Sequence, residues 1–237
     1  MGGIVLMIFF VGCFSDVKNI SYEDDQFVEQ DNIMEDSSYM KSIEMPIHFD
    51  SVDYIIYPLT FVKNYEKNSY KRGSYDYENW GYYSASEGYN NEIDDGYVGN
   101  FYNLIFQNTK TKEIKYLTND RIIGNKLRYL RETYKKTGKK YIILEIRDKD
   151  TNKDGEIDSE DIISLYICEV SGNNLQKLSP NNQNLLGWKI DNQLNKLYFQ
   201  TRQDINKDGV FDTQDSTLLY SVNLSQKIKT SKINLKH

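Results

Sequence analysis

The chain has 237 residues, a net charge of −6 and a sequence pI near 5.1. This acidic balance argues against nucleic-acid binding, for which a basic stripe is expected. With two cysteines and two histidines, the chain also lacks the residue clusters that form zinc sites or disulfide frameworks.

The amino terminus carries a short apolar run that ends at a cysteine. Ile4 to Gly12 (IVLMIFFVG) is too short to span a bilayer, which takes about 20 residues, and Cys13 follows directly. The run resembles a bacterial lipoprotein signal, in which Gly12 is the small residue before cleavage. The resemblance implies that residues 1–13 are a signal with Cys13 as lipidation site, which would anchor the protein to a membrane of the bacterial cell envelope, periplasmic or surface-exposed. A buried N-terminal strand is the alternative.

An acidic stretch follows the cysteine. Residues 14–42 contain SYEDDQFVEQDNIMEDSSY, which is rich in Asp and Glu and sparse in residues that form a core. Such a composition does not bury enough apolar surface to offset the entropy of ordering the chain. We expect a disordered tether that holds the folded part, residues 43–237, away from the membrane. A leader that only improves solubility is the alternative.

Strand patterns begin after this tether. Short runs rich in Val, Ile, Tyr and Phe, in which apolar and polar residues alternate, are typical of strands. A long insertion rich in Tyr and Gly, Lys63 to Asn100, separates the two middle strands of the first group, and we expect a surface flap there. The strands of this first group are expected at residues 43–49, 53–62, 101–108 and 113–118.

The insertion contains a cluster of aromatic residues. Aromatic side chains stack on sugars and anchor protein partners, so the insertion is a candidate binding surface for a glycan or a protein. Packing within strands is the alternative. The candidate residues are Trp80, Tyr82, Tyr83 and Tyr89.

Two further groups of strands are copies of each other. GKKYIILEIRD…ISLYICEVSGNNLQKLS aligns with NQLNKLYFQTRQD…TLLYSVNLSQKIKTSKI at a spacing of 54 residues. A period near 50 is typical of β-propeller blades. Cys168 falls inside one apolar strand, where we expect a small buried hydrophobe. The expected strands are 126–134, 140–147, 162–170 and 174–178, then 184–190, 195–202, 217–224 and 227–234.

An acidic twelve-residue pattern lies between the middle strands of both copies. It reads DTNKDGEIDSED from Asp150 to Asp161 and DINKDGVFDTQD from Asp204 to Asp215. Oxygen-bearing side chains stand at positions 1, 3 and 5, glycine at position 6 and aspartate at position 12. Calcium takes six to eight oxygens at roughly 2.4 Å, so a curled loop of alternating oxygen ligands suits it. Turn formation without a metal is the alternative.

Both patterns resemble EF-hand calcium loops. The resemblance implies two Ca²⁺ sites, with a backbone carbonyl as ligand at position 7. Aspartate replaces the usual glutamate at position 12, which implies modest affinity, with a Kd on the order of 10⁻⁴ to 10⁻³ M. Because strands flank the loops, calcium would staple hairpins rather than swing helices apart. The expected ligands are Asp150, Asn152, Asp154, Glu156 and Asp161, then Asp204, Asn206, Asp208, Val210 and Asp215.

The repeated strands resemble propeller blades. A strand after Gly-Lys-Lys, a second strand with Leu-Tyr, a turn and Leu-x-x-Leu-Ser/Thr are similar to blades of Tol-type periplasmic propellers and of prolyl oligopeptidase relatives. The resemblance implies an all-β fold of about three antiparallel four-stranded repeats over residues 43–237, with the calcium loops between strands. Because propellers have about four to eight blades, the array would be open or completed by a second copy of the chain.

Together these features favour a calcium-binding, lipid-anchored envelope protein with a structural or ligand-binding role. We do not expect an enzyme, because His48 and His237 are the only histidines and there is no G-x-S-x-G elbow. The competing hypothesis is a hydrolase of envelope glycans or peptides in which calcium is only structural. A dockerin-like module also pairs calcium loops with Asp at position 12, but its short helices and closer spacing are missing.

Overall fold

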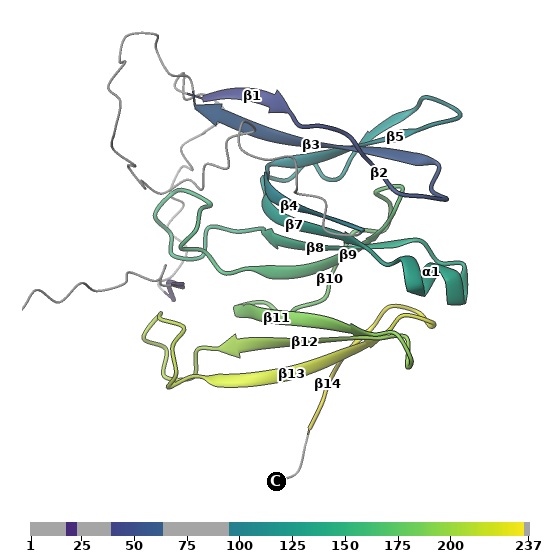
Figure 1. Cartoon of the computed structure of the whole chain (residues 1–237). Helices are drawn as coiled ribbons and strands as arrows, with labels where there is room; N and C mark the ends of the chain where they lie inside the picture. The colour runs from purple at the N-terminus through teal and green to yellow at the C-terminus, as the bar shows by residue number, and fades with distance from the viewer. Residues whose placement is uncertain (1–17, 23–38, 64–94, 235–237) are drawn as a thin grey trace, which may run out of the picture.

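Three antiparallel sheets make up most of the protein (Figure 1). The computed structural model describes residues 18–22, 39–63 and 95–234. The sheets are stacked face to face, and we name them the first, middle and last sheet in chain order. The expected all-β class is therefore confirmed, with four or five strands in each sheet.

The first sheet is built around the long strand β3. Strands β1 and β2 both pair with β3, β5 pairs with its other edge, and β6 follows β5. All of these pairs are antiparallel. The strands are β1 (Tyr39–Ile43), β2 (Ile47–His48), β3 (Tyr54–Lys63), β5 (Asn103–Asn108) and β6 (Ile114–Tyr116).

The middle sheet has the strand order β10-β9-β8-β7-β4. Strands β7 to β10 follow one another as a meander, whereas β4 comes earlier in the chain and pairs with the free edge of β7. Only Tyr102 separates β4 from β5, so the chain passes here directly into the first sheet. The strands are β4 (Gly96–Phe101), β7 (Ile123–Tyr129), β8 (Tyr141–Arg147), β9 (Ser164–Glu169) and β10 (Gln176–Lys177).

The last sheet is a four-stranded meander in the order β11-β12-β13-β14. A bulge between Leu185 and Gly187 interrupts the register of β11 with β12, and the pairing of β12 with β13 is regular over eight residue pairs. The strands are β11 (Gln183–Asp191), β12 (Lys196–Gln203), β13 (Ser216–Asn223) and β14 (Thr230–Lys232).

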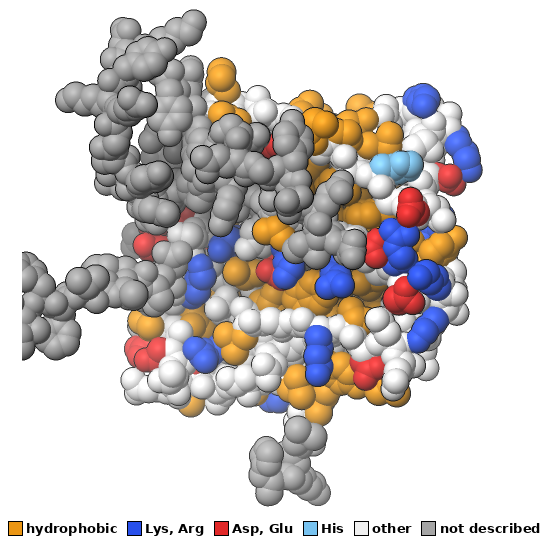
Figure 2. Space-filling view, in the orientation of Figure 1, with side chains coloured by type: hydrophobic (Ala, Val, Ile, Leu, Met, Phe, Trp, Pro, Cys, Tyr) orange, Lys and Arg blue, Asp and Glu red, His pale blue; other side chains and the backbone are white. Residues whose placement is uncertain are grey.

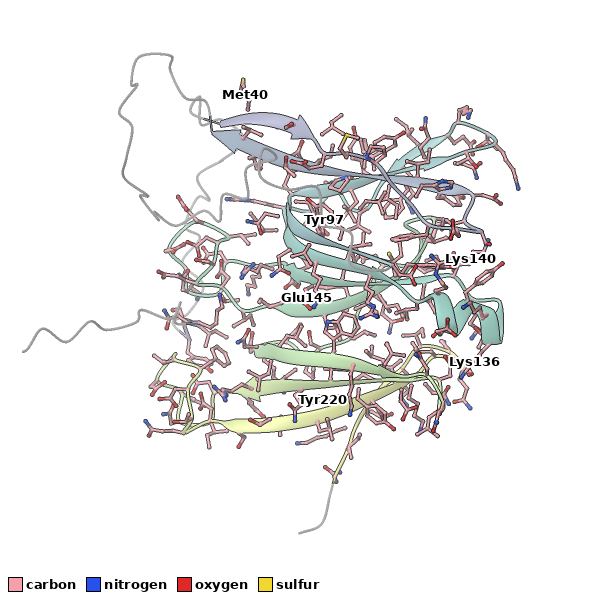
Figure 3. The ribbon with its side chains drawn as sticks, in the orientation of Figure 1. Met40, Tyr97, Lys136, Lys140, Glu145 and Tyr220 are labelled. Atoms are coloured by element: carbon pink, nitrogen blue, oxygen red, sulfur yellow. The ribbon has the colours of Figure 1, made fainter. Side chains whose placement is uncertain are left out.

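Apolar side chains fill the two spaces between the sheets, as the sticks in Figure 3 show. Strand β8 contributes to both cores because successive residues point to opposite faces. Ile142 and Leu144 pack toward the first sheet, and Ile143 packs toward the last. Tyr220, labelled in Figure 3, stacks on Phe199 at 5.2 Å in the second core. Burial on both faces explains why β8 is a continuous apolar run.

The prediction of a strand at residues 126–134 is wrong for its second half. Arg131–Thr137 instead forms the helix α1. An ion pair of helical i,i+3 spacing joins Glu132 to Lys135, and Gly138 ends the helix in the left-handed conformation, at φ 72°. Alignment of the two repeats predicts a strand here, whereas the local sequence of residues 131–138 favours a helix.

The insertion and the tether also differ from expectation. The insertion Lys63–Asn100 is not a flap throughout, because its last residues begin β4. The tether 14–42 includes Lys18–Tyr22, which bonds to both acidic loops, and the start of β1.

In the described parts of the chain, no helix is both long and apolar enough to cross a membrane. Outside the described residues lie Cys13, Trp80, Tyr82, Tyr83 and Tyr89.

Cys168 occupies the position expected of it. It lies in β9 and is 1% exposed. Burial, followed by the nearby charge of Glu169, raises the pKa of its thiol to about 12. The thiol therefore stays protonated at neutral pH and packs as a small apolar side chain, as predicted.

Candidate metal centre in two acidic loops

The two acidic patterns form hairpin loops at the same end of the stacked sheets (Figure 1). Loop 1, Asp150–Asp161, connects β8 to β9, and loop 2, Asp204–Asp215, connects β12 to β13. Both strand pairs are antiparallel. The hairpin setting predicted from the flanking residues is therefore confirmed, and strands rather than helices hold each loop.

The first aspartate organises the first half of each loop. Asp150 accepts hydrogen bonds from the backbone N–H of Lys153 at 2.6 Å and of Gly155 at 2.9 Å. The corresponding bonds to Asp204 in loop 2 measure 2.7 Å and 2.9 Å. In both loops, the carboxylate at position 1 thus holds the next five residues in a tight turn.

Positions 3 and 5 are linked to each other in the same way in both loops. In loop 1, Asn152 accepts the N–H of Asp154 at 3.2 Å and donates its amide to that carboxylate at 2.8 Å. Asp154 then accepts the N–H of Glu156 at 2.8 Å. The three matching distances in loop 2 are 3.0, 2.7 and 2.9 Å. The matching residues are Asn206, Asp208 and Val210.

The backbone repeats as closely as the hydrogen bonds. The backbone of Lys153 and Lys207 is in the left-handed conformation, at φ 62° and 60°. The glycines two residues later, Gly155 and Gly209, also have positive φ angles, 98° and 85°. A residue without Cβ reaches these angles at little cost. The glycine at position 6 therefore has the conformational role that the sequence pattern indicated.

The aspartate at position 12 closes the second half of each loop. Asp161 is fully buried and accepts bonds from the N–H of Thr151 at 2.5 Å, from its hydroxyl at 2.8 Å and from the N–H of Asp158 at 2.8 Å. Asp215 makes the two matching amide bonds at 3.0 Å and 3.1 Å and is 9% exposed. Each loop therefore brings a carboxylate inward at its end.

Burial and a neighbouring carboxylate both act on the charge of Asp161 in loop 1. Burial raises the pKa of Asp161 above its ordinary value of 3.8, and the charge of Asp150 adds to this, against the amide and hydroxyl donors that lower it. Two carboxylates within one small loop repel each other. A divalent cation held between them would remove that repulsion and stabilise both charges.

The side chains of each loop bond to the loop's own amides and not to one shared centre. Among the described residues, no three Asp, Glu, His or Cys side chains come together as a metal-binding group. An EF-hand-like donor set also includes an Asn oxygen and a backbone carbonyl. Asp154 and Asp208 at position 5 are exposed, so these are the two carboxylates that calcium would have to draw inward.

The segment Lys18–Tyr22 lies between the two loops, which the sequence analysis missed (Figure 1). Its backbone bonds to Thr151 of loop 1 and to Gly209 of loop 2. The hydroxyl of Tyr22 forms a hydrogen bond with Asp204; burial and then this bond raise the pKa of Tyr22 to about 12. The segment is surrounded by acidic residues and has no strand periodicity, so no local signal marks it.

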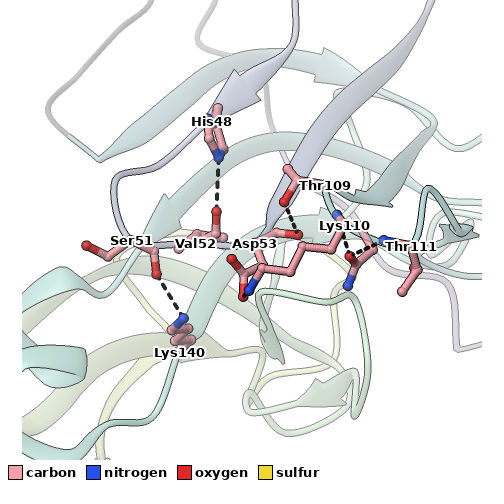
Figure 4. Close-up of polar contacts among 9 residues, drawn as sticks. His48, Ser51, Val52, Asp53, Thr109, Lys110, Thr111 and Lys140 are labelled. Atoms are coloured by element: carbon pink, nitrogen blue, oxygen red, sulfur yellow. Dashed lines mark hydrogen bonds and ion pairs between the residues drawn. The ribbon is translucent and has the colours of Figure 1, made fainter.

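His48 lies far from the loops, at the end of β2, where it faces the turn between β2 and β3 (Figure 4). Its Nε2 shares a hydrogen bond of 3.0 Å with the carbonyl of Val52. Asp53 of this turn pairs at 2.9 Å with Lys110, which lies in the turn between β5 and β6, and this hydrogen bond lowers the pKa of Asp53. These contacts hold the turn together, and none of them joins His48 to a nucleophile.

A cavity of about 290 Å³ opens between β7 and β11. Trp188 lines it and donates its Nε1–H to Glu145 at 2.7 Å, while Lys126 pairs with Glu145 at 3.3 Å and lies 5.3 Å from the Trp188 ring. Figure 2 shows apolar side chains between the sheets on this face, with lysines and arginines among them. Trp188, Lys126 and Glu145 thus bind one another at this cavity, and they do not point to a ligand class.

Comparison with known proteins adds no relative. No protein-family profile matches the chain, and neither a curated protein nor a solved structure is significantly similar to it. The residues and geometry of the two loops are therefore the basis for a functional conclusion.

Proposed function

We propose that this protein binds calcium, with one Ca²⁺ in each acidic loop, and that the two ions stabilise its β-hairpins. The observation that supports this most is the repetition of the hydrogen-bond scheme position by position, from Asp150 and Asp204 to Asp161 and Asp215. A hairpin that only reverses the chain needs about two to five residues. Twelve residues with oxygens at alternate positions suit a cation instead.

Calcium would act as a structural staple. An ion that binds the folded chain alone stabilises it by an amount set by its concentration relative to Kd. With a Kd on the order of 10⁻⁴ to 10⁻³ M, calcium at about 10 mM would contribute roughly 1.4 to 2.7 kcal/mol per site. Two such sites would shift the melting temperature by several degrees.

Calorimetric titration together with thermal unfolding tests this proposal. We expect two Ca²⁺ per chain and a higher melting temperature in calcium than in chelator. Asp154→Ala should remove one ion and Asp208→Ala the other, and the double variant should melt at the same temperature in both buffers. Asp50→Ala is the control, since Asp50 is 88% exposed and pairs with Arg131 of α1. Equal melting of the unaltered chain in calcium and chelator would contradict calcium binding.

The three sheets are, in this proposal, blade-like repeats. Support comes from the middle and last sheets, since β7 to β10 and β11 to β14 are both antiparallel meanders in chain order. The array would be open in one chain or completed by a second copy. Light scattering of the purified protein distinguishes the two, because completion requires at least twice the chain mass of 27.9 kDa.

The proposed location is the bacterial envelope, with Cys13 as the lipid-bearing residue. The apolar run Ile4–Gly12 that ends at Cys13 supports it. Changing Cys13→Ser should move the protein from the membrane fraction to the soluble fraction. A palmitate-labelled product of that variant would refute lipidation at this residue. Binding of a glycan or protein partner by the aromatic insertion stays a prediction.

A further inference from the structure

Loop 1 holds the segment Lys18–Tyr22 through main-chain hydrogen bonds. The N–H of Asn19 donates to the carbonyl of Glu160 at 3.0 Å, and the N–H of Ser21 donates to the carbonyl of Thr151 at 2.7 Å. These two acceptors stand near opposite ends of the loop. The segment therefore spans loop 1 from its second residue to its eleventh.

Loop 2 holds the same segment from the other side. The N–H of Ile20 donates to the carbonyl of Gly209 at 2.8 Å, and the N–H of Phe211 donates to the carbonyl of Lys18 at 3.2 Å. Between these bonds the segment forms an antiparallel β-bridge with loop 2. It docks as a short added strand, a mode in which main-chain bonds supply much of the affinity.

Side chains reinforce this contact. Ile20 is 7% exposed and packs with Ile162, which directly follows loop 1, and with Phe211 at position 8 of loop 2. The Thr151 hydroxyl also lies 3.0 Å from the carbonyl of Asn19. The three apolar residues form a small core of their own, separate from the two cores between the sheets.

We propose that Lys18–Tyr22 is a latch whose docking is strengthened when calcium orders the two loops. This inference rests on the proposed calcium function. These four main-chain partners lie within the loops, so docking of the segment requires that both loops keep their folded conformation. Tyr22 also bonds to Asp204, the residue at position 1 of loop 2. By linkage, a docked latch raises calcium affinity by the same factor by which calcium favours docking.

The latch would set how far the sheets stand from an anchored Cys13. Lys18 is five residues from Cys13, whereas the first residue of β1, Tyr39, is 26 residues from it. At about 3.3 to 3.6 Å per extended residue, the maximum reach is about 17 Å with the latch docked and about 90 Å with it released. Calcium would thus hold the stacked sheets close to the membrane.

Amide hydrogen exchange and calorimetry on the full-length chain test the latch separately from calcium binding. Exchange of residues 18–22 is followed by mass spectrometry in Ca²⁺, in Mg²⁺ and in chelator, and calorimetry counts the bound ions. We expect two bound Ca²⁺ and exchange in this segment about tenfold slower in Ca²⁺ than in chelator. Ile20→Ser should abolish the protection and weaken calcium affinity by the same factor.

Two glycine variants form a matched pair. A Cβ on Gly209 would lie 2.7 Å from the carbonyl oxygen of Ile20, whereas a Cβ on Gly155 meets no atom within 4 Å. The backbone of both glycines is in the left-handed conformation, so an alanine at either position strains its loop to a similar extent. We expect Gly209→Ala to lose the latch protection in calcium, about tenfold, and Gly155→Ala to keep most of it.

The possible outcomes separate the two proposals. Two bound Ca²⁺ with unchanged exchange of residues 18–22 would overturn the latch and leave the calcium function intact. No bound Ca²⁺ would overturn the calcium function and, with it, the calcium dependence of the latch. Equal loss of protection in Gly209→Ala and Gly155→Ala would show that loop strain, and not contact with the segment, controls docking, which also overturns the latch.

Discussion

Loop 1 and loop 2 share their hydrogen bonds but differ in how deeply they are enclosed. Asp161 of loop 1 is 0% exposed and Asp215 of loop 2 is 9% exposed; at position 2, Thr151 is 6% exposed and Ile205 is 55% exposed. The shared scheme follows from the spacing of Asp, Asn and Gly, which both loops have. The difference in burial follows from position 2 and from neighbours that the twelve-residue pattern does not include.

Position 2 shows how one residue changes its loop. The hydroxyl of Thr151 donates to Asp161 and accepts the N–H of Ile162 at 3.2 Å, which ties the start of loop 1 to its end. Ile205 has no hydroxyl, and its contact with Asp215 is made by its N–H alone. A cation in loop 1 would thus meet a more ordered site than a cation in loop 2.

Removing the aspartate at position 12 should have the largest effect and should separate the loops most clearly. Asp161→Ala removes the acceptor of three hydrogen bonds, two of them buried, and should lower the free energy of unfolding by about 3 kcal/mol, whereas Asp215→Ala should cost about half as much. Urea unfolding in chelator measures both without a contribution from calcium. Equal losses in the two variants would show that the difference in burial does not affect stability.

The residue two positions before each loop offers a second contrast. Asp148 pairs with Lys177 at 2.7 Å, whereas Arg202 stands at the corresponding place before loop 2. Burial alone would raise the pKa of Asp148, but Lys177 and the hydroxyls of Tyr166 and Ser164 hold it below 3.8. A depressed folded-state pKa stabilises the protein above the unfolded value and loses that effect as pH falls through the folded value.

Asp148→Asn should therefore destabilise the protein by about 1 to 2 kcal/mol at pH 7. The difference from the unaltered chain should shrink as the pH falls below 3.8, through the lowered pKa of Asp148. Urea unfolding of both chains across this range is the measurement. A difference that stays constant with pH would mean that the charge of Asp148 contributes nothing.

Exchanging the residues at position 2 should have the smallest effect. Thr151→Val removes the hydroxyl that bonds to Asp161 and should cost about 1 kcal/mol. Ile205→Thr adds a hydroxyl at an exposed position and should change the free energy of unfolding by less than about 0.5 kcal/mol. If Ile205→Thr gains as much stability as Thr151→Val loses, position 2 alone accounts for the contrast between the loops.

The strands and the loop conformation were predictable because their signals are local. Strands β8, β9, β12 and β13 lie within one or two residues of the ranges expected from their apolar and β-branched runs. The left-handed backbone at position 6 follows from glycine in an acidic loop. Both features are determined by residues close together in the chain.

The parts that were not predictable depend on contacts distant in sequence. Strand β4 lacks a clear signal of its own, because GYVGNF contains two glycines, and it is stabilised by pairing with β7. Ile20 is one of several scattered apolar residues in an acidic stretch, and its partners lie more than 100 residues later. Whether the carboxylates of each loop converge on an ion also depends on the ion itself.

The position of Lys18–Tyr22 also bears on the order in which the chain folds. This early segment bonds to Thr151 and to residues as late as Phe211, so during synthesis its last partner emerges 211 − 18 = 193 residues after Lys18. Contacts of such long sequence separation close late because of their entropic cost. Once in place, the segment joins the middle and last sheets at their loop end, and its release would be an early step of unfolding that leaves the sheets paired.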